Sequence, residues 1–292
     1  MKESLSYLAY LSAWKLIGLL PERSAYKLFR HLAHRMYRGN GKSVRRLRTN
    51  LSIVKPELTT LDLELLVMQG LESYMRYWCD TFRIHKWSPE RIESTVTTTN
   101  AHLLRDPMVQ GRGVVIALPH SGNWDHAGAY FCQQGIPLVT VAEVLKPEKL
   151  FQKFLEYRTS MGFEVLALDS RAFATLIRRA KEKRLIALVA DRDLSESGIP
   201  VTFFNRPTRM PAGPALLAIK TGIPLVVAHI SYTENGIHID FTEVKPWLLG
   251  DDDENISRTV AAIAAIFQDG IEAHPQDWHM LQKIWIEERL YQ

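Results

Sequence analysis

The chain has 292 residues, of which 46% are hydrophobic and 23% are charged, and this balance is typical of a folded globular protein. The composition excludes an intrinsically disordered chain. Only Cys79 and Cys132 are cysteines and they form no Cys-x-x-Cys pair, so we predict neither a disulfide framework nor a structural zinc site. The formal net charge of +4 is modest, but the positive charge gathers near the N-terminus.

The first apolar segment runs from Leu5 to Leu20, with its leucines at helical spacing. It contains Lys15 and ends at Pro21, so it is shorter than the roughly 20 apolar residues of a membrane-spanning helix. Tyrosine and tryptophan interrupt it, which argues against a secretory signal. Two interpretations stay open: an amphipathic helix that lies in a membrane surface, and a helix that packs on the protein body.

A basic stretch follows, because no acidic residue occurs from Arg23 through Pro56. Its lysines and arginines are Arg23, Lys27, Arg30, Arg35, Arg38, Lys42, Arg45, Arg46, Arg48 and Lys55. Anionic lipid headgroups attract such residues by about 1 kcal/mol each. Nucleic acid would attract them too, and a solvated face without a partner is the third interpretation. We predict that residues 1–56 contact an anionic membrane surface, with no nucleic-acid partner.

Helical spacing continues over Asp62–Phe82, and beyond Gly113 short apolar runs alternate with helical stretches. The predicted strands are Val114–Leu118, Pro137–Ala142, Glu164–Leu168, Leu185–Ala190, Pro224–Tyr232 and Ile237–Phe241. The predicted helices are Lys146–Met161, Arg171–Lys183, Pro214–Thr221 and Ile256–Ala273. This order predicts an α/β fold in which helices flank a mixed, mostly parallel sheet, with a helical membrane-associating N-terminal region. The turn Glu234-Asn235-Gly236 predicts an antiparallel edge, and we expect one domain over residues 1–292.

Polar residues follow two of the predicted strands at the edge where ligands bind in open α/β sheets. Pro119–His126 comes after the first strand, and Asp191–Gly198 comes after the strand at Leu185–Ala190. The first cluster holds a His-x4-Asp pair, His120 and Asp125. We predict His120 as a general base with Asp125 reaching back to its second ring nitrogen, although a purely structural histidine stays open.

The turn after His120 carries a second prediction. Gly122 permits a sharp turn, and a helix that starts near Asn123 would present free N–H groups to a developing oxyanion or a phosphate. Ser121 lacks a nucleophile-elbow setting and neither cysteine neighbours the motif, so we predict direct attack on the substrate without a covalent intermediate on the enzyme.

Three blocks of sequence give this chain a family resemblance. They are Ala117–Asp125, then Ala190–Leu194 running to Phe203-Phe204 and Arg209–Pro214, and finally Asp277–Gln282, with shorter matches at Val141–Glu143, Leu145–Glu148 and Tyr157-Arg158. In these blocks and their order the chain resembles the bacterial lipid A late acyltransferases, and within them the actinobacterial phosphatidylinositol mannoside acyltransferases.

The resemblance implies a peripheral enzyme at the cytoplasmic face of the cell membrane. Such an enzyme transfers a palmitoyl-type chain from acyl-CoA, its co-substrate, to a mannose hydroxyl of a phosphatidylinositol mannoside, with neither a cofactor nor a metal. The implied fold is a mixed sheet with a buried apolar groove for the acyl chain. A related acyltransferase with another glycolipid acceptor is the alternative.

The resemblance also assigns residues by position. His120 becomes the base and Asp125 its partner, while Asp191 stands where the mannoside enzymes place a glutamate near the histidine. Arg158 and Ser197 occupy donor-contacting positions. Lys220 stands where the relatives carry an acidic residue, so no role is transferred to it.

The residues themselves leave alternatives at four of the proposed positions. Arg158 fits a contact to CoA phosphate or to the thioester carbonyl, or a surface arginine. Asp191 fits a partner of His120, a helix N-cap or an ordinary salt bridge. Glu143 fits a sugar-hydroxyl contact or a surface charge, and Arg209 fits a phosphate contact or a brace for the nearby turn. We expect the aromatic residues of Tyr74–Trp78 to form core and Trp278-His279-Met280 to be packing.

Two competing functions remain. A metal-dependent hydrolase draws on ligand-type side chains near strand ends, namely His120, Asp125, His126, Asp191, Asp193 and His229. No His-x-His or His-Glu-x-x-His spacing occurs among them, which argues against it. A non-enzymatic membrane or nucleic-acid adaptor draws on the basic stretch alone.

Overall fold

The computed structural model describes residues 16–143, 148–193 and 197–286. Most of the predicted amphipathic segment Leu5–Leu20 therefore lies outside the described residues, as do the first two residues of the helix predicted from Lys146. Within the described ranges no helix is long and apolar enough to cross a membrane.

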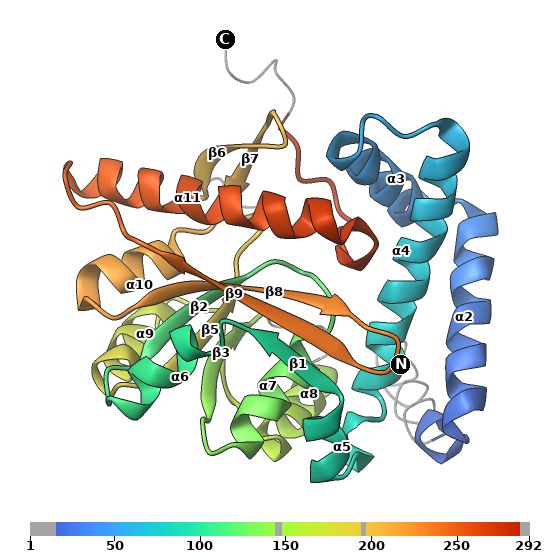
Figure 1. Cartoon of the computed structure of the whole chain (residues 1–292), viewed down its shortest axis with the longest axis horizontal. Helices are drawn as coiled ribbons and strands as arrows, with labels where there is room; N and C mark the ends of the chain where they lie inside the picture. Colours follow the sequence, from blue (N-terminus) through green and yellow to red (C-terminus); the bar gives the residue numbers. More distant parts are fainter. Residues whose placement is uncertain (1–15, 144–147, 194–196, 287–292) are drawn as a thin grey trace.

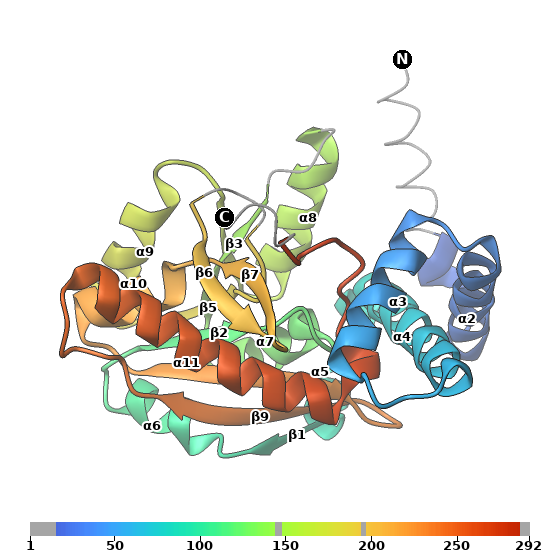
Figure 2. The same ribbon diagram turned by 90° about the horizontal axis from the view of Figure 1, so that it is seen from above.

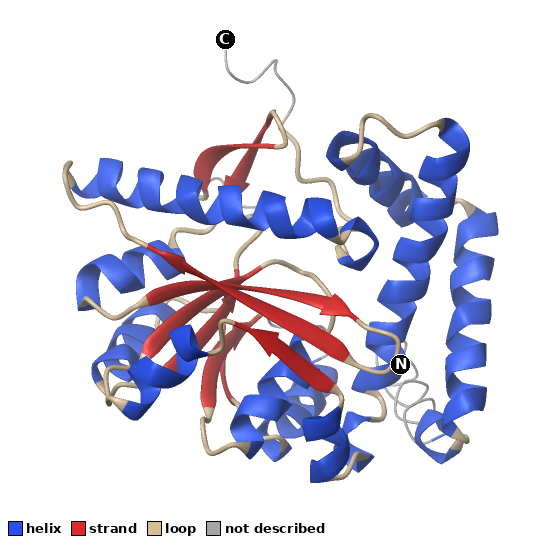
Figure 3. Ribbon diagram, viewed as in Figure 1, coloured by secondary structure: helices blue, strands red, loops and turns tan. Residues whose placement is uncertain are grey.

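A central sheet organises the body, with seven strands in the described residues (Figure 3). The strands are β1 (Val96–Thr99), β2 (Val114–Leu118), β3 (Leu138–Ala142), β4 (Glu164–Ala167), β5 (Leu185–Val189), β8 (Leu225–Tyr232) and β9 (Ile237–Val244). Their order is β1-β9-β8-β2-β5-β3-β4, and β2, β3, β4, β5 and β8 are parallel. The predicted mixed, mostly parallel sheet is confirmed.

The burial of each strand follows from its place in the sheet. All five residues of β2 are buried, as expected of a strand covered by helices on both faces. In β9 the inward Ile237, Ile239 and Phe241 are buried while Asp240 and Thr242 are exposed. The hairpin between β8 and β9 is antiparallel as predicted, but the edge strand is β1, which pairs in parallel with β9.

Helices cover both faces of the sheet (Figure 1). α6 (His102–Val109) and α7 (Trp124–Gln133) pack on one face around Ile116, Phe131 and Phe241. α9 (Ala172–Lys181), α10 (Gly213–Thr221) and α11 (Asp252–Ala273) cover the other face. α8 (Glu148–Ser160) contacts β4 near the sheet edge. These helices sandwich the sheet in two apolar cores.

The N-terminal helices form a separate layer beside the sheet (Figures 1 and 2). α2 (Glu22–Gly39), α3 (Lys42–Val54) and α4 (Thr60–Thr81) pack together through small apolar clusters of their own. α4 also contacts the short helix η2 (Pro275–Asp277), which precedes the segment beside His120. The predicted helical character of this region is confirmed, and its membrane contact stays a prediction.

Several elements have only weak signals in the sequence. β6 (Ile199–Phe203) and β7 (Arg206–Met210) form a small antiparallel hairpin that carries a proline in each strand, Pro200 and Pro207. Its turn residues Phe204 and Asn205 both have positive φ, where Asn-Gly is the recognisable hairpin signal. The short edge strand β1, the short helices η1 (Ile84–Lys86) and α5 (Pro89–Ser94), and α6 were not predicted either.

Candidate active site

The two polar clusters predicted at strand ends come together because β2 and β5 are neighbours in register. His120 Nδ1 lies 2.5 Å from Asp191 Oδ1, and the backbone N–H of His120 donates to Asp191 Oδ2 at 3.0 Å. The Asp191 side chain is fully buried, whereas the His120 side chain is 24% exposed. The open side of the imidazole thus faces the cavity described below, while the buried side is held by a carboxylate.

Trp278 completes the surroundings of Asp191. Its buried indole N–H donates to Asp191 Oδ2 at 2.9 Å. Burial raises the pKa of Asp191, but the nearby His120 and the hydrogen bonds from His120 and Trp278 together leave it below its ordinary value. The carboxylate is therefore ionised at neutral pH. The prediction that the Trp278 block only packs is incomplete. A buried indole N–H needs a hydrogen-bond acceptor, and this requirement pointed to a polar partner for Trp278.

The backbone around His120 is fixed by the segment after η2. Gly122 donates its N–H to the Asp277 carbonyl at 3.0 Å, and the His279 N–H donates to the His120 carbonyl at 2.8 Å. Gly122 has φ +59°, and a Cβ on it would lie 2.5 Å from the Ile230 carbonyl oxygen. No other residue fits this turn without moving β8.

The helix after the turn begins where the sequence predicted. Asn123 is the N-cap of α7, its Oδ1 accepting from the His126 N–H at 2.9 Å, while its Nδ2 donates to the buried Asp80 of α4. The backbone N–H groups of Trp124 and Asp125 have no hydrogen-bond partner among the described residues. Two unsatisfied donors thus lie at the start of α7, close to His120 in the chain.

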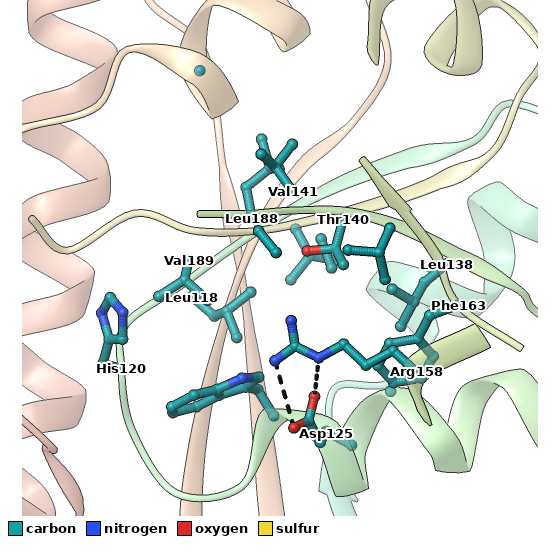
Figure 4. Close-up of a pocket in the computed structure, with 18 of the residues that line it drawn as sticks. Leu118, His120, Asp125, Leu138, Thr140, Val141, Arg158, Phe163, Leu188 and Val189 are labelled. Atoms are coloured by element: carbon teal, nitrogen blue, oxygen red, sulfur yellow. Dashed lines mark hydrogen bonds and ion pairs between the residues drawn. The ribbon is translucent and has the colours of Figure 1, made fainter. Parts of the chain in front are cut away.

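The prediction that Asp125 is the partner of His120 is wrong. Asp125 accepts from Arg158 Nε at 3.0 Å and from the Tyr77 hydroxyl at 3.2 Å, and Figure 4 shows Arg158 pointing at it and His120 lying apart. The helical twist of α7 carries Asp125 onto the side that meets α8. The Nδ1 atom of His120 is hydrogen-bonded to Asp191 instead.

The Asp125–Arg158 ion pair is almost entirely removed from solvent. The Asp125 side chain is 2% exposed and that of Arg158 is 17% exposed. Burial opposes the charge on Arg158, but the Asp125 carboxylate more than offsets this and holds the pKa of Arg158 above its ordinary value. Burial likewise raises the pKa of Tyr77, with Asp125 adding to the effect. Arg158 is thus a buried permanent cation, and not a surface arginine.

An apolar cavity of about 560 Å³ opens beside His120 and the ion pair. β3 pairs with β5 only at Leu138 and Val139, after which the two strands separate. Side chains of both strands line the cavity, and Figure 4 shows Thr140 and Val141 of β3, Leu188 and Val189 of β5, and Arg158 around it. The cavity walls include Leu118, Thr140, Val141, Phe163, Leu188 and Val189. Tyr77 and Trp78 also line it, so the expectation that this segment forms core is incomplete: the buried Tyr77 belongs to the core and to the cavity wall.

The remaining predicted residues fall in different places. Glu143 is exposed and lines the cavity. Arg209 lies on β7, and its Nη1 donates to the Gly198 carbonyl at 2.8 Å, so it holds the backbone just before β6. Ser197 is exposed, and among the described residues it is not part of the cavity wall. Lys220 is exposed in the last turn of α10.

The metal-ligand types named from the sequence are dispersed. In the part of the chain that the structure describes, no group of three or more His, Cys, Asp or Glu side chains is placed to hold a metal ion. His126 contacts the hydroxyl of Thr95, and His229 packs against Gly270 of α11.

Comparisons with known proteins place this chain in a family. The sequence model of the bacterial lipid A biosynthesis acyltransferase family matches residues 2–287. The chain belongs to this family. It is an acyltransferase by that membership, with helices around a mixed sheet and the His120 motif at the sheet edge.

Curated relatives resemble the acyltransferase over nearly its whole length. The phosphatidylinositol mannoside acyltransferase of Mycolicibacterium smegmatis is 40% identical over 284 residues, which cover 96% of this chain and 91% of the relative. The protein of the same description from Mycobacterium tuberculosis strain H37Rv is 38% identical over 283 residues, 95% of this chain and 88% of the relative.

Proposed function

We propose that this acyltransferase moves a palmitoyl-type chain from acyl-CoA to a mannose hydroxyl of a phosphatidylinositol mannoside. The observation that carries the proposal is the His120–Asp191 pair beside a 560 Å³ apolar cavity. The cavity suits an extended hydrocarbon chain, and the imidazole suits deprotonation of a hydroxyl. The names of the mycobacterial relatives support the acceptor class.

The chemistry needs one base and no covalent intermediate. Asp191 accepts a hydrogen bond from the Nδ1–H group of His120, so Nε2 carries the free lone pair that can take up a proton. Nε2 takes the acceptor hydroxyl proton as the oxygen attacks the thioester carbonyl carbon. The tetrahedral intermediate then collapses, the C–S bond breaks, and the departing CoA thiolate receives the proton from His120. Acyl-CoA is a co-substrate, and the reaction requires no cofactor or metal.

Two groups stabilise the developing negative charge in this proposal. The Trp124 and Asp125 N–H groups lie at the positive end of α7 and lack partners among the described residues. Arg158 engages Asp125 through Nε and Nη2, and its Nη1 has no hydrogen-bond partner in the described chain. We assign Nη1 to the thioester carbonyl, and Asp125 to holding Arg158 in place.

The cavity mouth and the polar loop supply the remaining contacts. Glu143 lines the cavity, and we assign it to accept hydrogen bonds from sugar hydroxyls of the acceptor. We assign the exposed Ser197 to a contact with the donor, and Arg209 acts indirectly by holding the backbone at Gly198. These assignments place the acyl chain inside the protein and both polar headgroups outside it.

The N-terminal helices hold the protein on an anionic membrane surface at the cytoplasmic face in this proposal. Exposed basic residues of α2, such as Lys27 and Arg35, alternate with the exposed Leu28 and Leu32. Basic residues with apolar neighbours favour binding to anionic bilayers through charge attraction and shallow insertion. Co-sedimentation with anionic and neutral vesicles tests this assignment.

Transfer of radiolabelled palmitoyl from its CoA thioester to a phosphatidylinositol mannoside tests the main proposal. We expect product from the wild type and a loss of about 10²–10⁴-fold in His120→Ala. If the wild type transfers the chain to a lipid A type acceptor but not to the mannoside, the acceptor is another glycolipid and the mannoside assignment is wrong. Transfer at the wild-type rate by His120→Ala would remove the base assignment.

A further inference from the structure

A second cavity, separate from the apolar cavity beside His120, lies between the N-terminal helices and the C-terminal segment. Its volume is about 560 Å³, within the usual range of ligand sites. The cavity is lined on one side by Lys42, Arg45 and Arg46 of α3. On the other side it is lined by Arg206, at the β6–β7 turn, and by Lys283 of the C-terminal segment. No acidic side chain lines the cavity among the described residues.

The walls of this cavity are held by hydrogen bonds. The buried Asn50 of α3 donates to the Met280 and Gln282 carbonyls and accepts from the Trp285 indole at 2.8 Å. Thr208 of β7 donates to the Ile284 carbonyl on the other side. Figure 2 shows the C-terminal segment passing between the β6–β7 hairpin and α3. The cations thus surround a preformed hollow.

The charges on α3 repel one another without an anion. Lys42 and Arg46 lie one turn apart on the same helix face, a like-charge arrangement that destabilises a helix by about 0.2–0.5 kcal/mol. Lys42, Arg45 and Arg46 form no ion pair among the described residues. Arg46 is half-buried, so its charge is also partly desolvated. A bound anion would relieve this repulsion.

The C-terminal segment links this cavity to the catalytic histidine. His279 donates its backbone N–H to the His120 carbonyl, and Lys283 lies only four residues further on. Four extended residues span at most about 14 Å. The cavity wall at Lys283 therefore lies within about 14 Å of the His279 backbone that contacts His120.

We propose that this cationic cavity binds the phosphate of the lipid acceptor while a sugar hydroxyl of the same headgroup reaches His120. The inference rests on the proposed function and adds to it a phosphate subsite built by Lys42, Arg45 and Arg46. Arginine and lysine are the side chains that recognise phosphate through charge-assisted hydrogen bonds. The subsite selects acceptors by their phosphate and orients the sugar toward the base.

Kinetics with a matched control variant test the subsite. The cavity variant is Lys42→Gln/Arg45→Gln/Arg46→Gln, and the control is Arg112→Gln/Lys181→Gln/Lys245→Gln, which removes the same charge from exposed residues at the opposite edge of the sheet. For a detergent-dispersed phosphatidylinositol mannoside we expect the cavity variant to raise the acceptor KM at least about tenfold. Its KM for acyl-CoA, and its KM for a phosphate-free alkyl mannoside, remain at wild-type values, and the control changes none of them.

Three outcomes overturn the inference. A raised KM for acyl-CoA would assign the cavity to the phosphates of the donor nucleotide. An equal rise of the acceptor KM in the control variant would show that the overall positive charge of the surface, and not this cavity, attracts the acceptor. Equal competition by inorganic phosphate and by the lipid headgroup would make it a site for free phosphate.

A binding arm separates this inference from the proposed reaction. If the wild type transfers no acyl chain to any mannoside, the proposed function fails, and co-sedimentation with phosphatidylcholine vesicles with and without phosphatidylinositol decides the subsite. Loss of the phosphatidylinositol-dependent binding in the cavity variant alone, at unchanged circular dichroism, supports the subsite. Equal binding by all three proteins contradicts it.

Discussion

Two buried carboxylates, Asp125 and Asp191, lie near the segment from His120 to Asp125, and they have different partners. Asp191 holds the imidazole of His120 together with the Trp278 indole, whereas Asp125 holds the guanidinium of Arg158 together with the Tyr77 hydroxyl. Both carboxylates are at most 2% exposed. The partner therefore decides the role: an imidazole exchanges a proton near neutral pH, while a guanidinium does not.

The comparison teaches that spacing in sequence is a poor guide to pairing at a strand-to-helix turn. Asp125 is five residues from His120 yet pairs with α8, while Asp191 is 71 residues away and pairs with the ring. We assign proton handling to the Asp191 side and structural support to the Asp125 side. The variants below are ordered by the size of the effect that this division predicts.

Asp191→Asn is expected to give the largest loss, about 10²-fold or more in kcat, because a neutral amide neither fixes the tautomer of His120 nor stabilises its protonated form. Steady-state transfer kinetics measure it, with the donor KM expected to stay near the wild-type value. Asp191→Glu is the matched control, because it keeps the charge at a fully buried position and should retain more activity than the amide.

Asp125→Asn is expected to reduce stability more than it changes the proton chemistry. It leaves Arg158 as an uncompensated buried charge, and breaking such a pair costs about 3–5 kcal/mol. Urea unfolding measures this loss. Asp125→Asn/Arg158→Met should recover part of the stability, and the pH–rate profile of Asp125→Asn should keep its wild-type shape. A shifted profile with unchanged stability would return Asp125 to the proton-handling side.

Acid conditions should destabilise the fold through three buried histidines. Burial lowers the pKa of His126 to about 4 and the pKa values of His229 and His279 to about 3. These groups are neutral in the fold, but the unfolded chain protonates them below about pH 6.5, so stability falls as the pH drops from about 6.5 toward 4.

The predicted slope is up to about 4 kcal/mol per pH unit for three protons. Urea unfolding free energies between pH 7 and 5 measure it. His229→Phe removes one of the three groups, and its slope should be about one third smaller. An unchanged slope in this variant would contradict the assignment of His229 as a neutral buried group.

The smallest predicted effect concerns acyl-chain length. Ala187 lies on β5 and lines the apolar cavity beside His120, so Ala187→Leu fills part of it. Each buried methylene of the chain is worth about 0.8 kcal/mol, which is about a fourfold preference. Competition between palmitoyl-CoA and lauroyl-CoA measures the change, and the preference for the longer chain should fall. No change would place the acyl chain elsewhere.

Much of the fold was predictable because its strands are buried, uninterrupted apolar runs, as at β2 and β5. The β6–β7 hairpin escaped prediction because prolines interrupt its strands and its turn lacks glycine. His120 was predictable from its place after β2. The partner of its ring was not, since the choice between Asp125 and Asp191 depends on the helical twist of α7 and on the register of β2 with β5.

A double-mutant cycle tests the central claim that His120 and Asp191 act as one unit. The measurement is kcat for acyl transfer in His120→Gln, Asp191→Asn, Asp125→Asn and the two double variants that contain His120→Gln. We predict that Asp191→Asn adds almost no further loss to His120→Gln, whereas Asp125→Asn adds its full independent effect. The reverse pattern, with Asp125 coupled to His120 and Asp191 additive, would contradict the account.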